Sequence, residues 1–329
     1  MALQSQGDGT LGTVASTASP AVTPRWPFLQ TTLKVSVLAL ALLLVLIPRN
    51  RVSPWAYPVL FGVPLVWAAI RRGAERAFLL WTMYVLSFVT FVVLRRVADN
   101  TGLPWLHRYV IEIDRMLGAG VLPTAYFQRL WYSADLPGFL DTATIGLHLS
   151  YYLVPPAAGM LFWYLNQVVF ERYVLAICMS YLAGLLVHFA VPTVPPWMAG
   201  QLGHIEPVAR VLYDGLHTFS PAFLRFGDMV AGGNAVAAMP SLHMATAFLV
   251  ALGLGRTGRL AGAVGILYAI AMGFALVYMG EHYVADLLGG ILLAWICWRA
   301  APYALAWGPT GAAAALGRIG ALLREGRVK

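Results

Sequence analysis

The 329-residue chain is 60% hydrophobic and only 11% charged, and its mean hydropathy is +0.72, so it has too much apolar surface for a water-soluble domain. The net charge is +8, but so apolar a chain has no polar face that could carry the basic patch of a nucleic-acid-binding protein. The composition therefore excludes nucleic-acid binding. The composition therefore indicates an integral membrane protein.

Eight apolar stretches that are almost free of charge follow one another along the chain. They cover residues 33–47, 55–70, 77–94, 143–165, 173–191, 239–254, 260–279 and 283–298. Most approach the ~20 residues that a membrane-spanning helix needs, so we predict an all-α protein with about eight transmembrane helices. The expected organisation is a disordered tail (1–27), N-terminal transmembrane helices (28–94), a catalytic membrane domain (95–300) and a cytoplasmic tail (301–329).

Charge is unevenly divided between the predicted loops. If all eight stretches cross the membrane, the side with both termini carries thirteen of the 22 Lys and Arg residues and four of the 14 acids, a net +9, and the other side carries −1. Because cytoplasmic loops are rich in Lys and Arg, we predict a multi-pass protein of the plasma (inner) membrane with cytoplasmic termini. The long loops 95–142 and 192–238 then face the extracytoplasmic side.

Ionisable residues at the ends of spans are costly and mark candidate sites. His282 and Asp286 are four residues apart, so on a helix the carboxylate can accept one ring N–H and strengthen the other nitrogen as a nucleophile or base. His243 precedes the sixth stretch, and two antiparallel helices return the chain to the same membrane face at His282. These three residues are the candidate catalytic groups, on the extracytoplasmic side.

The residues around His243 suit a phosphate-binding helix start. Pro240 loses no hydrogen bond there, and Ser241 can cap the helix and, with the free N–H groups, bind an anion. Asn234, behind two glycines, is a candidate phosphate contact, and the interfacial aromatic Tyr283 is a candidate substrate contact.

Three further features allow a structural explanation as readily as a functional one. His148 and His188 are single imidazoles in apolar stretches, where a histidine more often satisfies a neighbour. Residues 103–117 form an amphipathic segment that can lie on the membrane or simply pack as a loop.

Two histidine motifs resemble a known family. Residues 239–243 (Met-Pro-Ser-Leu-His) and 280–286 (Gly-Glu-His-Tyr-Val-Ala-Asp) resemble the second and third motifs of the inositol phosphorylceramide synthases and related inositolphosphotransferases, the aureobasidin-resistance branch of the type 2 phosphatidic acid phosphatase superfamily. Residues 192–197, which include Pro196 and Trp197, are similar to the proline-rich segment that opens the large loop of that branch.

The resemblance implies a fold and a mechanism. The C-terminal two thirds would form a six-helix bundle of the lipid phosphatase and phosphotransferase type. His282 would attack phosphorus to give a phosphohistidine, Asp286 would orient it, and His243 would protonate the leaving group. No metal and no cofactor are expected. The partners would be the bilayer, a phospholipid donor and a lipid or glycan acceptor.

The chain also departs from the phosphatase members of that superfamily. Those members carry a basic first motif and a Ser-Arg pair ahead of the third motif, whereas this chain has the proline-rich segment, with Pro196 and Trp197 as candidate substrate contacts, and an Ala-Leu pair at 275–276. The difference favours headgroup transfer, for example of inositol phosphate, over hydrolysis. Arg210, Arg225 and Arg129 are the candidates for the missing positive charge.

Four alternatives stay open at the level of sequence. A lipid phosphate or polyprenyl diphosphate phosphatase would use the same residues with water as acceptor. Two histidines and a carboxylate can also bind zinc in a hydrolase. A lipid transporter or flippase and a catalytically silent lipid-binding scaffold are the non-enzymatic alternatives.

Overall fold

The computed structural model describes residues 75–95, 101–133, 138–219 and 236–306. The first two predicted spans, the N-terminal tail, Asn234, Arg225 and residues 307–329 of the predicted C-terminal tail lie outside the described residues, whereas residues 301–306 of that tail continue helix α14. Within the described part the chain is helical apart from isolated bridges, as predicted. Its helices are α3 (Glu75–Leu94), α4 (Arg108–Leu117), α5 (Pro123–Trp131), α6 (Phe139–Ser150), α7 (Val154–Leu165), α8 (Gln167–Ala190), α9 (Pro196–Gln201), α10 (Val211–Phe219), α12 (Leu242–Leu254), α13 (Arg259–Tyr278) and α14 (Val284–Ala306).

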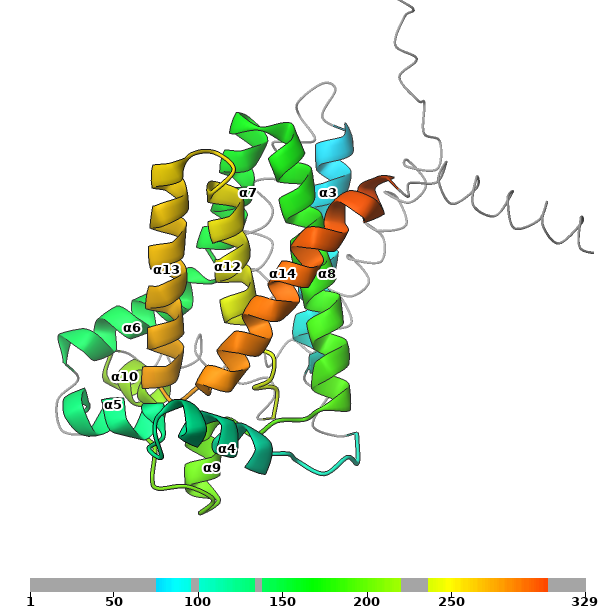
Figure 1. Ribbon diagram of the computed structural model, residues 1–329. Coiled ribbons are helices and arrows are strands. Elements are labelled where there is room, and N and C mark those ends of the chain that lie inside the picture. The colour runs from blue at the N-terminus through cyan, green and yellow to red at the C-terminus, as the bar shows by residue number, and fades with distance from the viewer. Residues whose placement is uncertain (1–74, 96–100, 134–137, 220–235, 307–329) are drawn as a thin grey trace, which may run out of the picture.

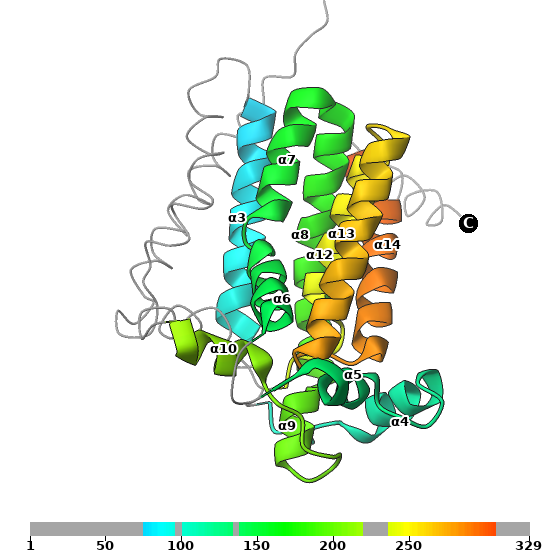
Figure 2. The ribbon, with the colours of Figure 1, turned by 90° about the vertical axis from the view of Figure 1, so that its left-hand side faces the viewer.

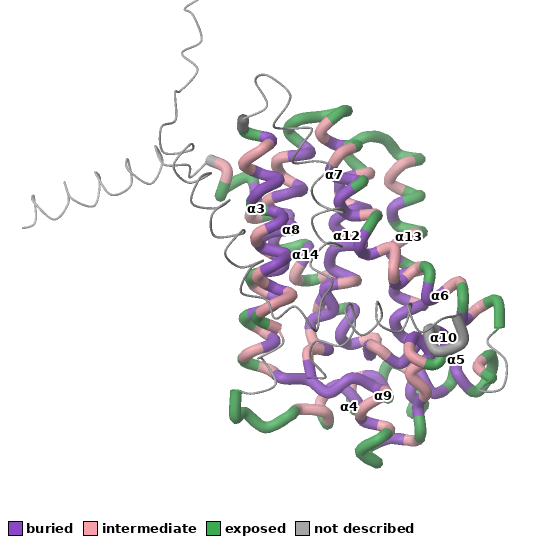
Figure 3. Tube along the Cα trace, turned by 180° about the vertical axis from the view of Figure 1, so that it is seen from behind, coloured by how far each residue is buried: buried purple, intermediate pink, exposed green. Residues whose placement is uncertain are grey.

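The long helices form a bundle, and short helices cover one end of it. Helices α3, α7, α8, α12, α13 and α14 run alongside one another, whereas α4, α5, α9 and α10 gather at the end where α14 begins (Figures 1 and 2). Buried residues follow the inward faces of the bundle, and the turns at its ends are exposed (Figure 3). The short helices thus lie over the end at which the candidate catalytic residues are found.

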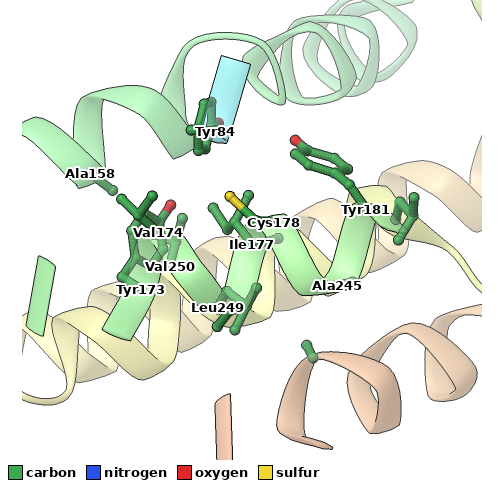
Figure 4. Close-up of a cluster of buried hydrophobic side chains, with 14 of the residues drawn as sticks. Tyr84, Ala158, Tyr173, Val174, Ile177, Cys178, Tyr181, Ala245, Leu249 and Val250 are labelled. Carbon is green, nitrogen blue, oxygen red and sulfur yellow. The ribbon is translucent and has the colours of Figure 1, made fainter. Parts of the chain in front are cut away.

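Helix α8 lies at the centre of the apolar core. Its residues Tyr173, Val174, Ile177, Cys178 and Tyr181 pack among Tyr84 of α3, Ala158 of α7 and Ala245, Leu249 and Val250 of α12 (Figure 4). The outer face of α13 is apolar but exposed: Leu260, Leu267 and Ile270 are 81%, 66% and 63% exposed. Such a face is favourable against lipid and unfavourable against water, so the bundle is that of an integral membrane protein.

All six predicted spans that fall in the described part are helical. Helices α3, α8, α13 and α14 are long and apolar enough to cross a membrane, and α6 with α7, which meet at 51°, make a fifth span if they are taken together. The bend follows from Pro155 and Pro156 in the first turn of α7, because proline has no N–H with which to continue the preceding helix. The predicted span 143–165 is therefore broken at residues 151–153.

Helix α12 is shorter than the stretch 239–254 from which it was predicted. It has 13 residues, about 20 Å of helix against a hydrocarbon core of about 30 Å. Gly273 of α13 lies beside Met244 in the first turn of α12, and α13 continues for five more residues to Tyr278. The start of α12, with His243, is thus recessed into the bundle by about 7 Å.

The amphipathic segment 103–117 packs as a loop helix against the end of the bundle. Val110 and Ile111 of α4 are buried in a small apolar cluster, whereas Leu117 at the end of the helix is 53% exposed. Asp114 is fully buried in the same helix. The buried face of α4 is therefore set by contacts with the bundle, which the helical period alone does not reveal.

Candidate active site

The candidate nucleophile His282 is held by the carboxylate that its spacing predicts. Its Nδ1 lies 3.4 Å from Oδ2 of Asp286, and the same oxygen accepts the backbone N–H of Tyr283 at 2.9 Å. Asp286 is fully buried, and His282 is 7% exposed. Because a carboxylate oxygen only accepts, Nδ1 of His282 carries the proton and Nε2 keeps its lone pair.

The structure places His243 close to His282. Ser241 is the N-cap of α12, and its hydroxyl accepts the N–H of Met244 at 3.3 Å, which puts His243 in the first helical turn. The ring centres of His243 and His282 lie 5.9 Å apart. The two histidine motifs, separated by the α12–α13 hairpin, therefore meet at one end of the bundle.

Helices α12 and α14 hold the two motifs together by close backbone packing. The N–H of Ser241 donates to the carbonyl of Asp286 at 3.0 Å. A side chain at Gly290 would overlap the carbonyl oxygen of Ser241, so only glycine allows the helices to approach this closely. The position of His243 relative to His282 is thus fixed through the backbone.

A second carboxylate, which the sequence reading missed, fixes the start of α14. Asp114 of α4 accepts the backbone N–H groups of Val284 and Ala285 at 2.9 and 2.8 Å. Burial raises the pKa of this carboxyl to about 6, and the two N–H groups lower it only in part. Asp114 therefore caps the helix that carries Asp286 and follows His282.

Both histidines open onto a cavity of about 60 Å³, room for about four waters at roughly 15 Å³ each. Its lining comes from α3, α6, α8, α9, α12 and the connecting segments: Phe91, Arg95, His148, Tyr151, His188, Pro195, Trp197, Arg210, Ala237, Ala238, Leu242, His243, Glu281 and His282. Four imidazoles, two guanidinium groups and one carboxylate thus face the same small space.

Arg210 is engaged by several groups at once. Its Nε lies 2.8 Å from Oε1 of Glu281, and its guanidinium lies over the rings of Trp197 and Tyr213 at 4.3 and 4.6 Å. Burial alone raises the pKa of Glu281, but the adjacent Arg210 lowers it below the ordinary value, so this carboxylate is ionised at neutral pH. The Arg210–Glu281 pair therefore presents to the cavity a guanidinium whose positive charge is partly neutralised.

The proline-rich segment is built into the same site. Thr193 forms isolated parallel bridges with Leu106 and Ala237, and the backbone N–H of Trp197 donates to the carbonyl of Gly280 at 3.0 Å. The segment therefore connects the residues that lead into α4 and into the second motif with the third motif.

Several predicted contacts lie away from the cavity lining. Ser241 is buried as a helix cap, and Pro196 is buried at the start of α9. Tyr283 packs in the apolar cluster under α4 and α5. Arg129 pairs with Glu206 beside a separate outer groove. Of the predicted phosphate and substrate contacts in the described part, Arg210 and Trp197 line the cavity.

The cavity also contains residues to which the sequence reading gave no role or a structural one. The rings of His148 and Tyr151 lie 4.5 and 4.3 Å from that of His243. His188 and Arg95 complete this side of the lining. Arg95 had a readable signal, because it is the first charge after the third apolar stretch, at the end that the loop count assigns to the site.

Histidines and arginines around a buried cavity in an apolar helical bundle are the groups that an integral membrane enzyme acting on phosphorylated lipids requires. The model of the PAP2 superfamily matches residues 108–300, more than half of the chain. The chain belongs to this superfamily of membrane lipid phosphatases and phosphotransferases, which confirms the family resemblance seen in the motifs.

The chain is also similar to a protein with a more specific name, over part of its length. The phosphoinositol dihydroceramide synthase of Bacteroides thetaiotaomicron is 30% identical over 199 residues, which are 57% of this chain and 62% of the relative. The chain therefore spans about three fifths of the length of that relative. No solved structure matches the chain.

Proposed function

We propose that the protein is a phosphotransferase that moves a phosphoryl headgroup, such as inositol phosphate, from a phospholipid to a lipid or glycan acceptor through a phosphohistidine on His282. The observation that carries the proposal is the joint geometry of three residues. Asp286 holds Nδ1 of His282 at 3.4 Å, and the ring of His243 lies 5.9 Å from that of His282 across the same cavity.

In the first half-reaction, Nε2 of His282 attacks the phosphorus of the donor lipid. The bond between phosphorus and the diacylglycerol oxygen breaks, and protonated His243 gives its proton to that oxygen. Asp286 stabilises the positive charge that develops on the imidazole, and the cationic groups Arg95 and Arg210 of the lining oppose the charge on the phosphoryl oxygens.

In the second half-reaction, His243 is neutral and takes the proton of the acceptor hydroxyl. The acceptor oxygen forms a new bond to phosphorus, the nitrogen–phosphorus bond breaks, and its electron pair returns to Nε2 of His282. The same steps with water as acceptor would be a phosphatase reaction, so the reaction type depends on which hydroxyl the site admits.

Two observations favour transfer. The guanidinium of Arg210 is shared with Glu281, and Leu276 and Ala275, at the place of the Ser-Arg pair of phosphatase members, are fully buried apolar residues. The name of the Bacteroides relative supports inositol phosphate as the headgroup and a ceramide-type lipid as the acceptor.

The test is lipid mass spectrometry on the purified protein in detergent, supplied with phosphatidylinositol and either dihydroceramide or water alone. We expect diacylglycerol together with an inositol-phosphoryl dihydroceramide, and a loss of about 10³-fold or more in folded His282→Ala and His243→Ala variants. Full turnover in either variant contradicts the mechanism.

Three other outcomes identify the alternatives. Release of soluble inositol phosphate with no transfer indicates a phosphatase. Activity that a chelator removes and zinc restores indicates a zinc hydrolase; among the described residues no three His, Cys, Asp or Glu side chains are grouped to hold a metal ion. Lipid movement between the leaflets of vesicles, without any change of lipid in detergent, indicates a transporter.

A further inference from the structure

The mechanism above leaves two buried histidines of the cavity without a role, His148 and His188, and His188 is the one with a hydrogen bond to a catalytic motif. His188, near the end of α8, is 2% exposed and lines the cavity with the catalytic histidines. Its Nε2 lies 3.1 Å from the carbonyl oxygen of Pro240, in the second motif. Its Nδ1 is buried and has no hydrogen-bond partner among the described residues.

The contact with Pro240 decides which ring nitrogen carries the proton. A carbonyl oxygen only accepts, so Nε2 of His188 must donate. In the neutral ring, Nδ1 then presents a lone pair. A buried acceptor that has lost its water is unfavourable unless a donor reaches it, so this atom needs a ligand that brings a hydrogen.

The chemistry of Nδ1 selects the kind of ligand. A lone pair repels the anionic oxygens of a phosphoryl group, for which the cavity already offers Arg95 and Arg210. The lone pair on Nδ1 instead accepts a hydrogen bond from an O–H group. The apolar side chains of Phe91 and Leu242 share the lining with His188, and the ring centre of Phe91 lies 5.9 Å from that of His188. The hydroxyl of a lipid alcohol fits these neighbours better than that of a free sugar.

We propose that Nδ1 of His188 accepts a hydrogen bond from the hydroxyl of the acceptor lipid and so forms the acceptor subsite. The proposal rests on the function proposed above, in which a second alcohol attacks the phosphohistidine. It assigns recognition of the acceptor to α8, whereas α12 and the start of α14 carry the covalent chemistry.

Two substitutions separate this role from a structural one. His188→Gln keeps an N–H donor near the position of Nε2, so the contact with Pro240 can persist while the Nδ1 acceptor is lost. His188→Asn places an amide oxygen near the position of Nδ1 but is too short to reach Pro240. A subsite role requires the acceptor, and a structural role requires the donor.

The experiment measures both half-reactions with phosphatidylinositol as donor and dihydroceramide as acceptor. The burst of diacylglycerol without acceptor reports phosphohistidine formation, and the rate at varied dihydroceramide gives the KM for the acceptor. We expect His188→Gln to raise that KM about tenfold, the effect of one lost hydrogen bond, with a much smaller change in the burst. His188→Asn should stay within about threefold of the wild-type KM. His204→Gln, in which the exposed ring stacked on His107 is changed outside the cavity, should match the wild type.

Two results overturn the subsite. One is an unchanged acceptor KM in His188→Gln, and the other is a greater loss in His188→Asn than in His188→Gln, which would show that the tie to Pro240 is what matters. A wild-type protein without a diacylglycerol burst would instead refute the covalent mechanism itself, and the acceptor subsite with it.

Discussion

The buried carboxylate of Asp286 holds two groups with one oxygen. Oδ2 accepts the N–H of Tyr283, which stabilises the first turn of α14, and it also faces Nδ1 of His282. The backbone contact fixes the carboxylate, and the fixed carboxylate sets the orientation of the imidazole. Positioning of the nucleophile is thus a consequence of how the helix begins.

Asp286→Asn tests this orienting role. Because Oδ2 alone faces both groups, an amide oxygen in its place keeps both contacts but loses the negative charge that stabilises the imidazolium. An amide nitrogen in its place loses the Tyr283 contact and donates to Nδ1 of His282, which moves the ring proton to Nε2, the attacking atom. We expect kcat to fall by about 10² to 10⁴-fold with little change in the KM for the donor lipid, measured by diacylglycerol release. An unchanged kcat in a variant that unfolds at the wild-type temperature would contradict the role.

Asp114→Asn has an expected signature in the pH dependence of stability. The pKa of Asp114 is about 6 in the folded protein and ordinarily 3.8, so between these values the folded chain binds more protons than the unfolded chain. The stability that Asp114 contributes is therefore largest at low pH and decreases as the pH rises from about 4 to about 6. The difference in Tm between wild type and Asp114→Asn should be smaller at pH 7.5 than at pH 4.5. Equal differences at the two pH values would contradict the raised pKa.

At the scale of elements, the site depends on how closely α12 approaches α14. Gly290→Ala would insert a methyl group against the carbonyl of Ser241, and we expect a loss of about 1 to 3 kcal/mol in the free energy of unfolding together with lower activity. Gly146→Ala on α6 is the matched control, because a side chain there meets no atom within 4 Å. Thermal unfolding in detergent compares the two variants. If Gly290→Ala is as stable as Gly146→Ala, the close packing does not hold the motifs together.

The sequence predicted the elements of the site better than their contacts. The four-residue spacing of His282 and Asp286 and the hairpin that returns His243 to them are local features, which periodicity and span length reveal. Asp114 is different, because its partners Val284 and Ala285 lie 170 and 171 residues away and no short-range pattern connects them.

His148 and His188 also could not be assigned to the site from the sequence. His148 and His188 were read as ordinary buried imidazoles because nothing local distinguishes them in an apolar stretch. The break after α6 turns His148 and Tyr151 toward His243, and only the packing of the bundle shows this. The cap at Ser241 predicted where α12 begins, but the position of this start relative to the end of α13 depends on how the two helices pack.

At the scale of the whole molecule, the long helices of the described part alternate in direction (Figure 1). The candidate site lies at the end where α3 finishes and α14 begins, and the Arg256–Arg259 turn lies at the other end (Figure 1). We propose that the termini are cytoplasmic, that the site end is extracytoplasmic, and that residues 95–300 are the catalytic membrane domain.

Cysteine labelling in intact cells tests this orientation. Gln201→Cys, at the end of α9, should react with a membrane-impermeant maleimide, whereas Thr257→Cys, in the α12–α13 turn, should react only after permeabilisation. Both positions are exposed, and the native Cys178 and Cys297 are buried, so background labelling should be low. The reverse pattern would place the site in the cytoplasm.

The proposed reaction requires a covalent intermediate on His282. The most direct measurement is mass spectrometry of peptides from the purified protein, quenched at alkaline pH within one turnover of phosphatidylinositol and without acceptor. We expect an inositol-phosphate adduct on His282 that disappears when dihydroceramide is added and is absent from His282→Ala. No adduct under these conditions, or an adduct on another residue that persists in His282→Ala, would contradict the proposed reaction.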